Sequence, residues 1–246
     1  ALATALESLG VAIVYEGQPG YPPLALERSR PPGGAVAVDT TVSSQFASSL
    51  MMVAPLLPMG LTVTISPQTV SRPYLGLTRG VMEAFGAAVS FVDDVTIAVA
   101  PRPYNPGEYA VEGDWSAAAF LLVAGRIAGR EVSFTNLDGD SPQGDRAILS
   151  FLGELDRPRE HRLDLSHAPD LIAPLAVAAL FAEHPTALRG AAHTRVKESD
   201  RVSVLARELA KVGASIGEIE DGLLITPAPL HGRVRLDPAR DHRMAM

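Results

Sequence analysis

The sequence predicts an α/β protein of two domains, assembled from repeated βαβαββ units. Two observations carry this prediction: strand-like apolar runs alternate with apolar helical runs along the chain, and the same order of elements returns at intervals. The length of 246 residues, 47% of them hydrophobic, is enough for two modest cores, and 21 Gly with 20 Pro divide the chain into short elements. We expect domains at residues 1–106 and 107–246, with the stretch PRPYNPG near their boundary.

The copies of the unit follow one another from residue 34 onward. The first complete copy spans residues 34–101, the third spans 161–229, and the run VRLDPARDHRMAM opens a fourth. The second copy begins at residue 108 with expected strands at EYAVEG and EVSFTNL, but it is short, and we expect one β-hairpin to be missing near residues 156–162. Because the chain starts inside one apolar helical run and stops just inside another helix, we expect a fragment of a longer protein.

Three predicted helices are apolar on nearly every side: residues 46–57, 117–128 and 171–182. A helix on the surface of a sheet shows a polar face, which these three lack. We therefore expect these helices inside and the sheets outside.

The charge and composition exclude several classes of function. The chain has 21 Lys and Arg against 28 Asp and Glu, a formal net charge of −7, which opposes binding to nucleic acid. It has no Cys, and its six His show no metal-ligand spacing, so neither a disulfide nor a metal site is expected. Pro and Gly interrupt the uncharged stretch 41–71, and no signal-peptide pattern opens the chain, so we expect a cytoplasmic protein without membrane spans.

The segment RVKESDR holds the most informative cluster of charges. Lys197 and Arg201 are four residues apart, on one face of the expected helix start, and like charges at this spacing destabilise a helix unless an anion lies between them. One interpretation is a solvated helix start with Ser199 and Asp200 as its cap. The other is a binding site for a carboxylate or phosphate, with Glu198 beside it as a proton donor.

Other expected helix starts present hydroxyl or carboxyl groups. Ser43, Ser44 and Gln45 precede the first apolar helix, and Ser71 opens the helix after it. Such hydroxyls either cap the helix or bind a phosphate together with the free amide groups. Asp170 begins another apolar helix, where most such carboxylates are caps.

The last expected helix opens at Asp241 and Arg243. A positive side chain in the first turn has the unfavourable sign for the helix dipole. This position therefore favours a ligand at Arg243.

Seven motifs together are similar, in order and spacing, to the 5-enolpyruvylshikimate-3-phosphate synthase family. They are SSQF, SRPY, VEGDWSAAAF, SPQGD, HAPD, RVKESDR and DHRMAM, and they cover essentially the whole chain. The resemblance implies the two-domain enolpyruvyl transferase fold, an inside-out α/β barrel with helices inside and sheets outside. This chain would hold about four of the six βαβαββ units of that fold.

The resemblance also implies an activity. The family transfers the enolpyruvyl group of phosphoenolpyruvate to the 5-hydroxyl of shikimate 3-phosphate and releases phosphate, in the shikimate pathway to chorismate and aromatic amino acids. It uses no metal or organic cofactor and usually works as a monomer. The implied partners are the two small-molecule substrates.

Matching motifs carry the family's shikimate 3-phosphate site onto this chain. Ser43, Ser44 and Ser71 would hold the phosphate of shikimate 3-phosphate. Gln45 would touch both substrates, and Tyr74 would lie near the shikimate ring.

The same resemblance implies the catalytic groups. Asp170 would take the 5-hydroxyl proton as general base, and Lys197 would lie between the substrates. Glu198 would exchange protons with the methylene carbon of phosphoenolpyruvate, and Arg201 and Arg243 would bind the phosphoenolpyruvate anion.

The chain departs from the family pattern in two respects. His193 stands where the family commonly has Asn; it can still bond a shikimate hydroxyl, with a dependence on pH. The family's N-terminal Lys-Ser pair, its downstream Arg, its Gly-rich loop and a late Lys fall outside these residues. We therefore expect the 246-residue piece by itself to have little or no activity.

Three alternatives stay open on the sequence. The sister transferase acting on UDP-N-acetylglucosamine shares the fold and the reaction, although SSQF, RVKESDR and DHRMAM favour the shikimate enzyme. An inactive remnant of the same fold would tend to lose the costly charge cluster first. An unrelated phosphate-binding module is opposed only by the order of the motifs.

Overall fold

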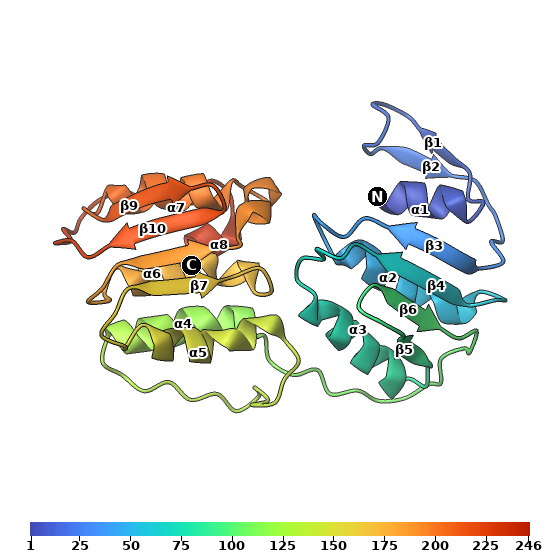
Figure 1. The fold of residues 1–246 in the computed structure, drawn as a ribbon, viewed down its shortest axis with the longest axis horizontal. Coiled ribbons are helices and arrows are strands. Elements are labelled where there is room, and N and C mark those ends of the chain that lie inside the picture. The colour runs from blue at the N-terminus through green and yellow to red at the C-terminus, as the bar shows by residue number, and fades with distance from the viewer. The chain divides into compact units, whose positions relative to one another are not determined.

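The computed structural model describes all 246 residues and divides them into two compact units, residues 1–110 and 111–246 (Figure 1). Each unit has its own four-stranded sheet and its own hydrophobic core. None of the helices combines the length and the apolar character needed to span a membrane.

The first unit contains one complete βαβαββ copy after a short helix and a hairpin. Its elements are α1 (Leu2–Ser8), β1 (Ile13–Tyr15), β2 (Leu24–Leu26), β3 (Gly34–Val38), α2 (Gln45–Val53), the 3-10 turn η1 (Ala54–Leu56), β4 (Leu61–Ile65), α3 (Pro73–Ala84), β5 (Val89–Phe91) and β6 (Thr96–Val99). The sheet has the order β3-β4-β6-β5, with β3 and β4 parallel and β6 antiparallel to both of its neighbours. Helices α2 and α3 contact each other and the sheet, so they cover the same face.

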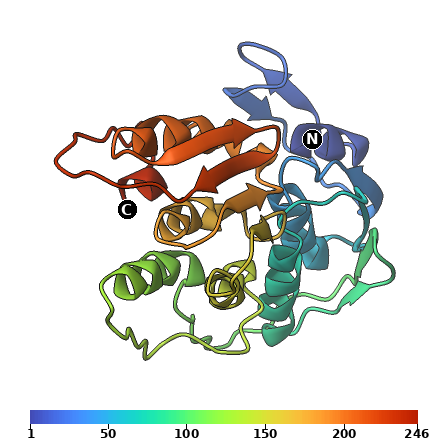
Figure 2. The ribbon, with the colours of Figure 1, turned by 60° about the vertical axis from the view of Figure 1, so that its left-hand side comes forward.

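The second unit repeats this arrangement around residues 161–226. Its elements are α4 (Trp115–Ile127), η2 (Gly144–Ala147), α5 (Ile148–Glu154), β7 (His161–Asp164), η3 (Pro169–Leu171), α6 (Ile172–Ala179), β8 (Thr186–Arg189), η4 (Ala192–Val196), α7 (Arg201–Ala210), β9 (Ser215–Ile219), β10 (Gly222–Thr226) and α8 (His242–Ala245). The sheet order is β7-β8-β10-β9, with β7 and β8 parallel and β10 antiparallel to its neighbours. In both views helix α4, in green, lies beside this sheet (Figures 1 and 2).

The two sheets confirm the predicted repeat, because the strands of each pair in the same order and the same directions. The alternating pattern is the cause. Along β4, Leu61, Val63 and Ile65 are buried while Thr62 and Thr64 are exposed, since successive side chains of a strand point to opposite faces. One apolar face per sheet then requires a cover of helices, which α2 and α3, and α6 and α7, provide.

The expected strands of the second copy do not form, and that prediction is wrong. Residues 108–113 and 131–137 have no strand structure; one backbone hydrogen bond joins them, from the amide of Gly113 to the carbonyl of Asn136. Helix α5 leads through a turn directly to β7, so the copy has no closing hairpin. Two extended segments without further strands are marginal in water, which accounts for the missing sheet.

Of the three apolar helices expected inside, α6 is enclosed on nearly every side, whereas α2 and α4 each leave one side exposed. Seven of the eight residues of α6 are buried. In contrast, Met52 of α2 and Leu121 of α4 are each about half exposed, because α2 packs on the sheet and α3, and α4 packs on α6 and neighbouring turns, leaving one side open. Helix α2 is also shorter than the predicted range of residues 46–57, because it ends at Val53. Pro55, which has no N–H to donate, lies in the turn η1.

Strand β7 begins with a buried histidine. His161 is 1% exposed, and neither ring nitrogen has a hydrogen-bond partner. Burial lowers the pKa of His161, the charge of Glu154 opposes this shift, and His184 and Arg159 add to it. The folded protein therefore binds a proton here less readily than the unfolded chain does.

We predict that β7 loses protection as the pH falls below about 6.5, the ordinary pKa of a histidine. The unfolded state takes up the proton first, so stability is lost as the pH falls. Amide hydrogen exchange of residues 161–164, expressed as protection factors at pH 7 and pH 5.5, measures the effect. The variant His161→Phe keeps the ring volume without the titrating nitrogens and should lose less protection; an equal loss in both proteins would contradict the prediction.

Candidate functional site

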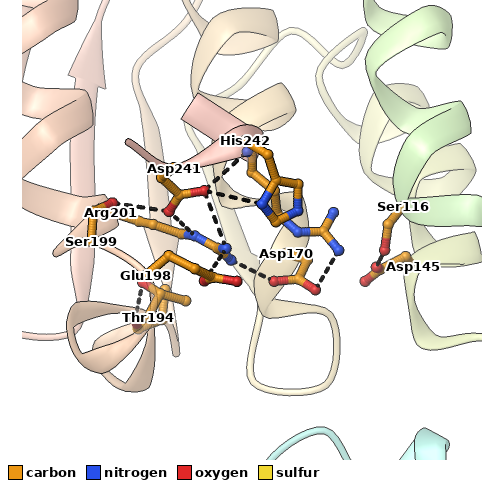
Figure 3. Close-up of polar contacts among 11 residues, drawn as sticks. Ser116, Asp145, Asp170, Thr194, Glu198, Ser199, Arg201, Asp241 and His242 are labelled. Atoms are coloured by element: carbon orange, nitrogen blue, oxygen red, sulfur yellow. Dashed lines mark hydrogen bonds and ion pairs between the residues drawn. The ribbon is translucent and has the colours of Figure 1, made fainter. Parts of the chain in front are cut away.

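A buried arginine is the centre of the polar cluster in the second unit (Figure 3). Arg201 is the first residue of α7, its side chain is 2% exposed, and three carboxylates surround its guanidinium. Nη1 donates to Asp170 Oδ1 over 2.6 Å, Nη2 to Glu198 Oε2 over 2.7 Å, and Nε to Asp241 Oδ2 over 2.9 Å. A buried charge requires such partners, because the interior does not replace the water it has lost.

Each carboxylate comes from a different segment. Asp170 lies in η3, at the start of the helix that leads into α6, and Glu198 lies in the loop between η4 and α7. Asp241 is the N-cap of α8 and accepts the backbone amide of Arg243 over 2.9 Å. Arg201 therefore joins three stretches of chain that are far apart in the sequence.

A second arginine completes the cluster. Arg243 Nη2 lies 2.9 Å from Asp170 Oδ2, so each oxygen of Asp170 faces one guanidinium. Asp170 is thus an ion-pair partner of two arginines and not a helix cap; the interpretation of this residue as a cap is wrong. The sequence favoured an anion at Arg243, and in this structure the anion is the side chain of Asp170.

Asp241 is the most enclosed member of the cluster, with a side chain that is 0% exposed. Burial by itself raises the pKa of Asp241, but the hydrogen bonds from Arg201, from the hydroxyl of Ser199 and from the amide of Arg243 outweigh burial and hold the pKa below its usual value. Ser199 Oγ donates to Asp241 Oδ2 over 2.9 Å. The sequence indicated Asp241 only as a helix start; its role as a partner of Arg201 depends on a contact across 40 positions, for which the sequence gives no local signal.

Arg195 ties the loop that carries Lys197 and Glu198 to the sheet. Its Nη1 donates to Glu218 Oε2 on β9 over 2.7 Å and to Ser203 Oγ over 3.1 Å, and it also pairs with Asp200. Asp200 caps α7 by accepting the amide of Ser203. The helix therefore starts after Asp200, and the expectation that Lys197 and Arg201 share one helix face is wrong: Lys197 is in the exposed loop before it.

His193 lies close to the charged cluster, on η4. Its Nε2 is buried without a hydrogen-bond partner. Burial lowers the pKa of His193, the charge of Lys197 lowers it further, and Asp170 opposes both effects. The imidazole is therefore neutral near pH 7, with one unsatisfied nitrogen beside the ion pairs.

The turn before η4 requires glycine. Gly190 has φ of +72°, and a Cβ there would lie 2.4 Å from Asp164 Oδ1. Its amide donates to Asp221 Oδ2 over 3.0 Å, which holds the turn against the β9–β10 hairpin. This turn directs the chain from β8 toward His193.

The first unit holds the other predicted site residues, on the first turns of α2 and α3. Ser44 Oγ donates to the carbonyl of Ser71 over 3.3 Å, and Ser43 Oγ accepts the amide of Gln45 over 3.2 Å. Of the two interpretations of Ser44, the cap is wrong, because its hydroxyl bonds the neighbouring loop and does not bond an amide of α2. The amide of Tyr74 donates to the carbonyl of Ser71 over 3.1 Å, at the start of α3.

Ser71 has an unusual backbone conformation, with φ of +52° in the left-handed region. A residue with a side chain pays a cost of about 1 kcal/mol or more there, and such strain is common at ligand-binding positions. The hydroxyls of Thr40 and Thr69, both buried, bond each other over 2.5 Å and so join the two loops that carry Ser44 and Ser71. These threonines were not predicted from the sequence, although each lies within three positions of a predicted serine, Ser43 or Ser71.

The structure thus gathers the predicted residues into two groups. Asp170, Glu198, Arg201 and Arg243 are joined by ion pairs in the second unit, and His193 and Lys197 lie close to them. The first unit gathers five others on two neighbouring helix starts: Ser43, Ser44, Gln45, Ser71 and Tyr74.

We predict that Arg195→Ala loosens the loop of residues 196–200 and lowers the free energy of unfolding of the second unit by about 2 kcal/mol, because several bonds to carboxylates are lost at a partly buried site. Hydrogen exchange of the loop amides and chemical unfolding measure the two effects. Arg189→Ala is the matched control: Arg189 pairs with Asp221 at 3.3 Å and its side chain is 53% exposed, so its loss should cost about 0.5 kcal/mol. Equal effects of the two substitutions would show that Arg195 does not hold this loop against the sheet.

Comparison with known proteins identifies a family. The family model of EPSP synthase (3-phosphoshikimate 1-carboxyvinyltransferase) matches residues 1–246. The chain is 39% identical over 262 residues to the 3-phosphoshikimate 1-carboxyvinyltransferase of Methanoculleus marisnigri, covering 100% of this chain and 62% of that protein. It is 35% identical over 262 residues to the protein of the same name from Marinomonas sp., with the same coverage.

Solved structures agree on the fold. EPSP synthase from Acinetobacter baumannii superposes with a TM-score of 0.75 at 24% identity, covering 99% of this chain and 61% of that one. The enolpyruvyl transferase NikO from Streptomyces tendae superposes with a TM-score of 0.62 at 15% identity, covering 93% and 58%. The fold is therefore that of the enolpyruvyl transferases, and the chain spans about three fifths of the length of the curated relatives it matches.

Proposed function

The chain belongs to the EPSP synthase family, and on this premise we propose that it carries catalytic groups for transfer of the carboxyvinyl group of phosphoenolpyruvate to shikimate 3-phosphate. The observation that carries the proposal is the cluster around Arg201, where two arginines face two partly exposed carboxylates. Cations for an anionic substrate, a base and an acid are thereby gathered in one place.

The proposed chemistry is an addition followed by an elimination. The 5-hydroxyl oxygen of shikimate 3-phosphate attacks C2 of phosphoenolpyruvate, and Asp170 takes the hydroxyl proton. Glu198 gives a proton to the methylene carbon, so that C2 becomes tetrahedral without leaving a carbanion. Return of a proton from the new methyl group to Glu198 restores the double bond as the C2–O bond to phosphate breaks. Arg201 and Arg243 bind the anionic groups of phosphoenolpyruvate throughout.

The first unit supplies neutral donors in this proposal. Ser43, Ser44 and Ser71 bind the phosphate of shikimate 3-phosphate with hydroxyl and amide groups at the starts of α2 and α3, where the helix dipoles favour an anion. Gln45 reaches both substrates, and Tyr74 packs near the shikimate ring. The strained backbone of Ser71 supports a ligand-binding role for this loop.

Lys197 and His193 complete the proposed site. Lys197 is in the exposed loop beside Glu198, in a position to pair with phosphate groups between the substrates. The unpartnered Nε2 of His193 is available to accept or donate a hydrogen bond with a shikimate hydroxyl.

We further propose that residues 1–106 belong to the first substrate-binding domain and residues 107–246 to the second, with the base and the phosphoenolpyruvate arginines. The enzyme works in the cytoplasm as a monomer and without a metal or organic cofactor. The family membership supports these assignments.

The alternative substrate is UDP-N-acetylglucosamine. The names of the curated relatives favour shikimate 3-phosphate, whereas the likeness to NikO reflects the fold that these transferases share. An inactive remnant is disfavoured, because burying charged groups is costly and a protein without activity would tend to lose them. In this chain the cluster is intact, and each guanidinium group has a carboxylate partner.

We predict phosphate release when the complete reading frame around this chain is incubated with phosphoenolpyruvate and shikimate 3-phosphate, with the product verified by mass. Asp170→Ala should lower kcat by about 100-fold or more, the typical contribution of a positioned base. Release with UDP-N-acetylglucosamine alone, or with neither acceptor, would contradict the proposal.

We predict that binding of shikimate 3-phosphate weakens only at pH values below 6.5, the ordinary pKa of a histidine, because the pKa of His193 is lowered and its protonation removes the acceptor nitrogen proposed to bond a shikimate hydroxyl. The lowered pKa of His193 keeps the imidazole neutral above that range. The Michaelis constant for shikimate 3-phosphate, measured from pH 5 to pH 8, gives the result. His193→Asn removes the titrating group and should flatten this part of the profile; identical profiles would exclude the role.

A further inference from the structure

Figure 3 shows the three carboxylates around Arg201, and they differ in their exposure to solvent. The side chain of Asp241 is 0% exposed, that of Asp170 is 24% exposed, and that of Glu198 is 50% exposed. Asp241 also accepts bonds from Ser199 and from the amide of Arg243, so it is held on all sides by the protein. Asp241 is therefore a fixed partner, whereas an incoming ligand can reach the other two.

Resting on the proposed function, we propose that Asp170 and Glu198 compete with phosphoenolpyruvate for the guanidinium groups of Arg201 and Arg243. In this structure the two carboxylates neutralise both arginines. The substrate anion then displaces at least one of them, and this releases the base and the acid for catalysis.

The donor geometry supports displacement. Asp241 accepts from Nε of Arg201 over 2.9 Å and, more weakly, from Nη2 over 3.5 Å. The short bonds of the two Nη groups, over 2.6 and 2.7 Å, go to Asp170 and Glu198. The Nη2 group of Arg243 is engaged by the other oxygen of Asp170. A substrate carboxylate needs the same forked donors for a bidentate bond, so the two sets of oxygens compete.

The charges support the same sequence of events. Arg201 and Arg243 carry two positive charges and are paired with three carboxylates, Asp170, Glu198 and Asp241, while Lys197 is in the exposed loop and makes no ion pair with them. Adding an anion without moving a carboxylate would place four or more negative groups around two guanidiniums in a partly buried site, which is costly. Outward movement of Asp170 or Glu198 into solvent removes that cost, and their exposure permits it.

The displacement links binding to reactivity. While both oxygens of Asp170 face guanidinium groups, neither is directed at a hydroxyl. Once the substrate anion has taken the arginines, one oxygen of Asp170 is free for the 5-hydroxyl. The acceptor is thus activated only when phosphoenolpyruvate is present.

The test measures binding of phosphoenolpyruvate without turnover. The complete reading frame is saturated with 5-deoxyshikimate 3-phosphate, which has no 5-hydroxyl to react, and phosphoenolpyruvate is titrated by calorimetry. Asp170→Asn and Glu198→Gln remove one competing charge each, and we expect each to bind phosphoenolpyruvate about tenfold more tightly than the unchanged protein, the effect of one ion pair that no longer has to be broken. Glu198 is half exposed, so Glu198→Gln tests the point even if Asp170→Asn folds poorly.

The control is Glu160→Gln, which removes the same charge from an exposed position just before β7 and should leave the affinity unchanged. A crystal structure of the ternary complex gives the second readout: at least one of the contacts from Asp170 or Glu198 to the arginines should exceed 4 Å.

If the unchanged protein turns over normally but both variants bind phosphoenolpyruvate with unchanged or lower affinity, or if all contacts persist in the complex, this inference is overturned and the proposed function stands. Absence of both phosphoenolpyruvate binding and phosphate release in the unchanged protein would overturn the two proposals together.

Discussion

Burial of one positive charge, that of Arg201, is the constraint on which the site of the second unit depends. The guanidinium is removed from water at the start of α7 and must find carboxylates in the protein. The structure supplies them from η3, from the loop before α7 and from the cap of α8, so that satisfying Arg201 fixes three separate segments at once. Removal of a single partner would leave a buried charge partly unpaired, which is the costly way to disturb such a cluster.

The predicted site residues of the first unit are neutral, unlike the charged cluster of the second unit. The first unit has no buried charge at the starts of α2 and α3; hydroxyl groups and backbone amides are gathered there instead. The bond between Thr40 and Thr69 holds the two loops together, and Ser71 keeps a left-handed backbone conformation. A phosphate can be bound by hydroxyl and amide groups at helix starts. Proton transfer, in contrast, needs carboxylates whose pKa is set by neighbouring charges. The two units therefore suit the two halves of the proposed reaction.

The sequence predicted the features that depend on local patterns, and it missed those that depend on long-range contacts. Alternating residues such as Leu61, Val63 and Ile65 predicted strands correctly, and the run around α6 predicted a buried helix. The extended segment before α4 looked equally strand-like, but a strand exists only with a partner, and the shortened second copy offers none. For the site, the charges of RVKESDR predicted a ligand anion from the premise that Lys197 and Arg201 share one helix face, and that premise is wrong because α7 starts at Arg201. That the anion in this structure would be the protein's own Asp170, Glu198 and Asp241 could not be read from spacing, because two of these contacts cross 31 and 40 positions.

The most direct test of the account is the fate of solvent hydrogen during turnover. If Glu198 protonates the methylene carbon and later removes a proton from the resulting methyl group, the reaction in D₂O must leave deuterium in the vinyl group of the product. The account predicts a product of increased mass with the label at that carbon, and loss of the label and of turnover together in Glu198→Gln. An unlabelled vinyl group formed at a normal rate would show that the double bond is never protonated, and it would contradict the roles assigned to the Arg201 cluster.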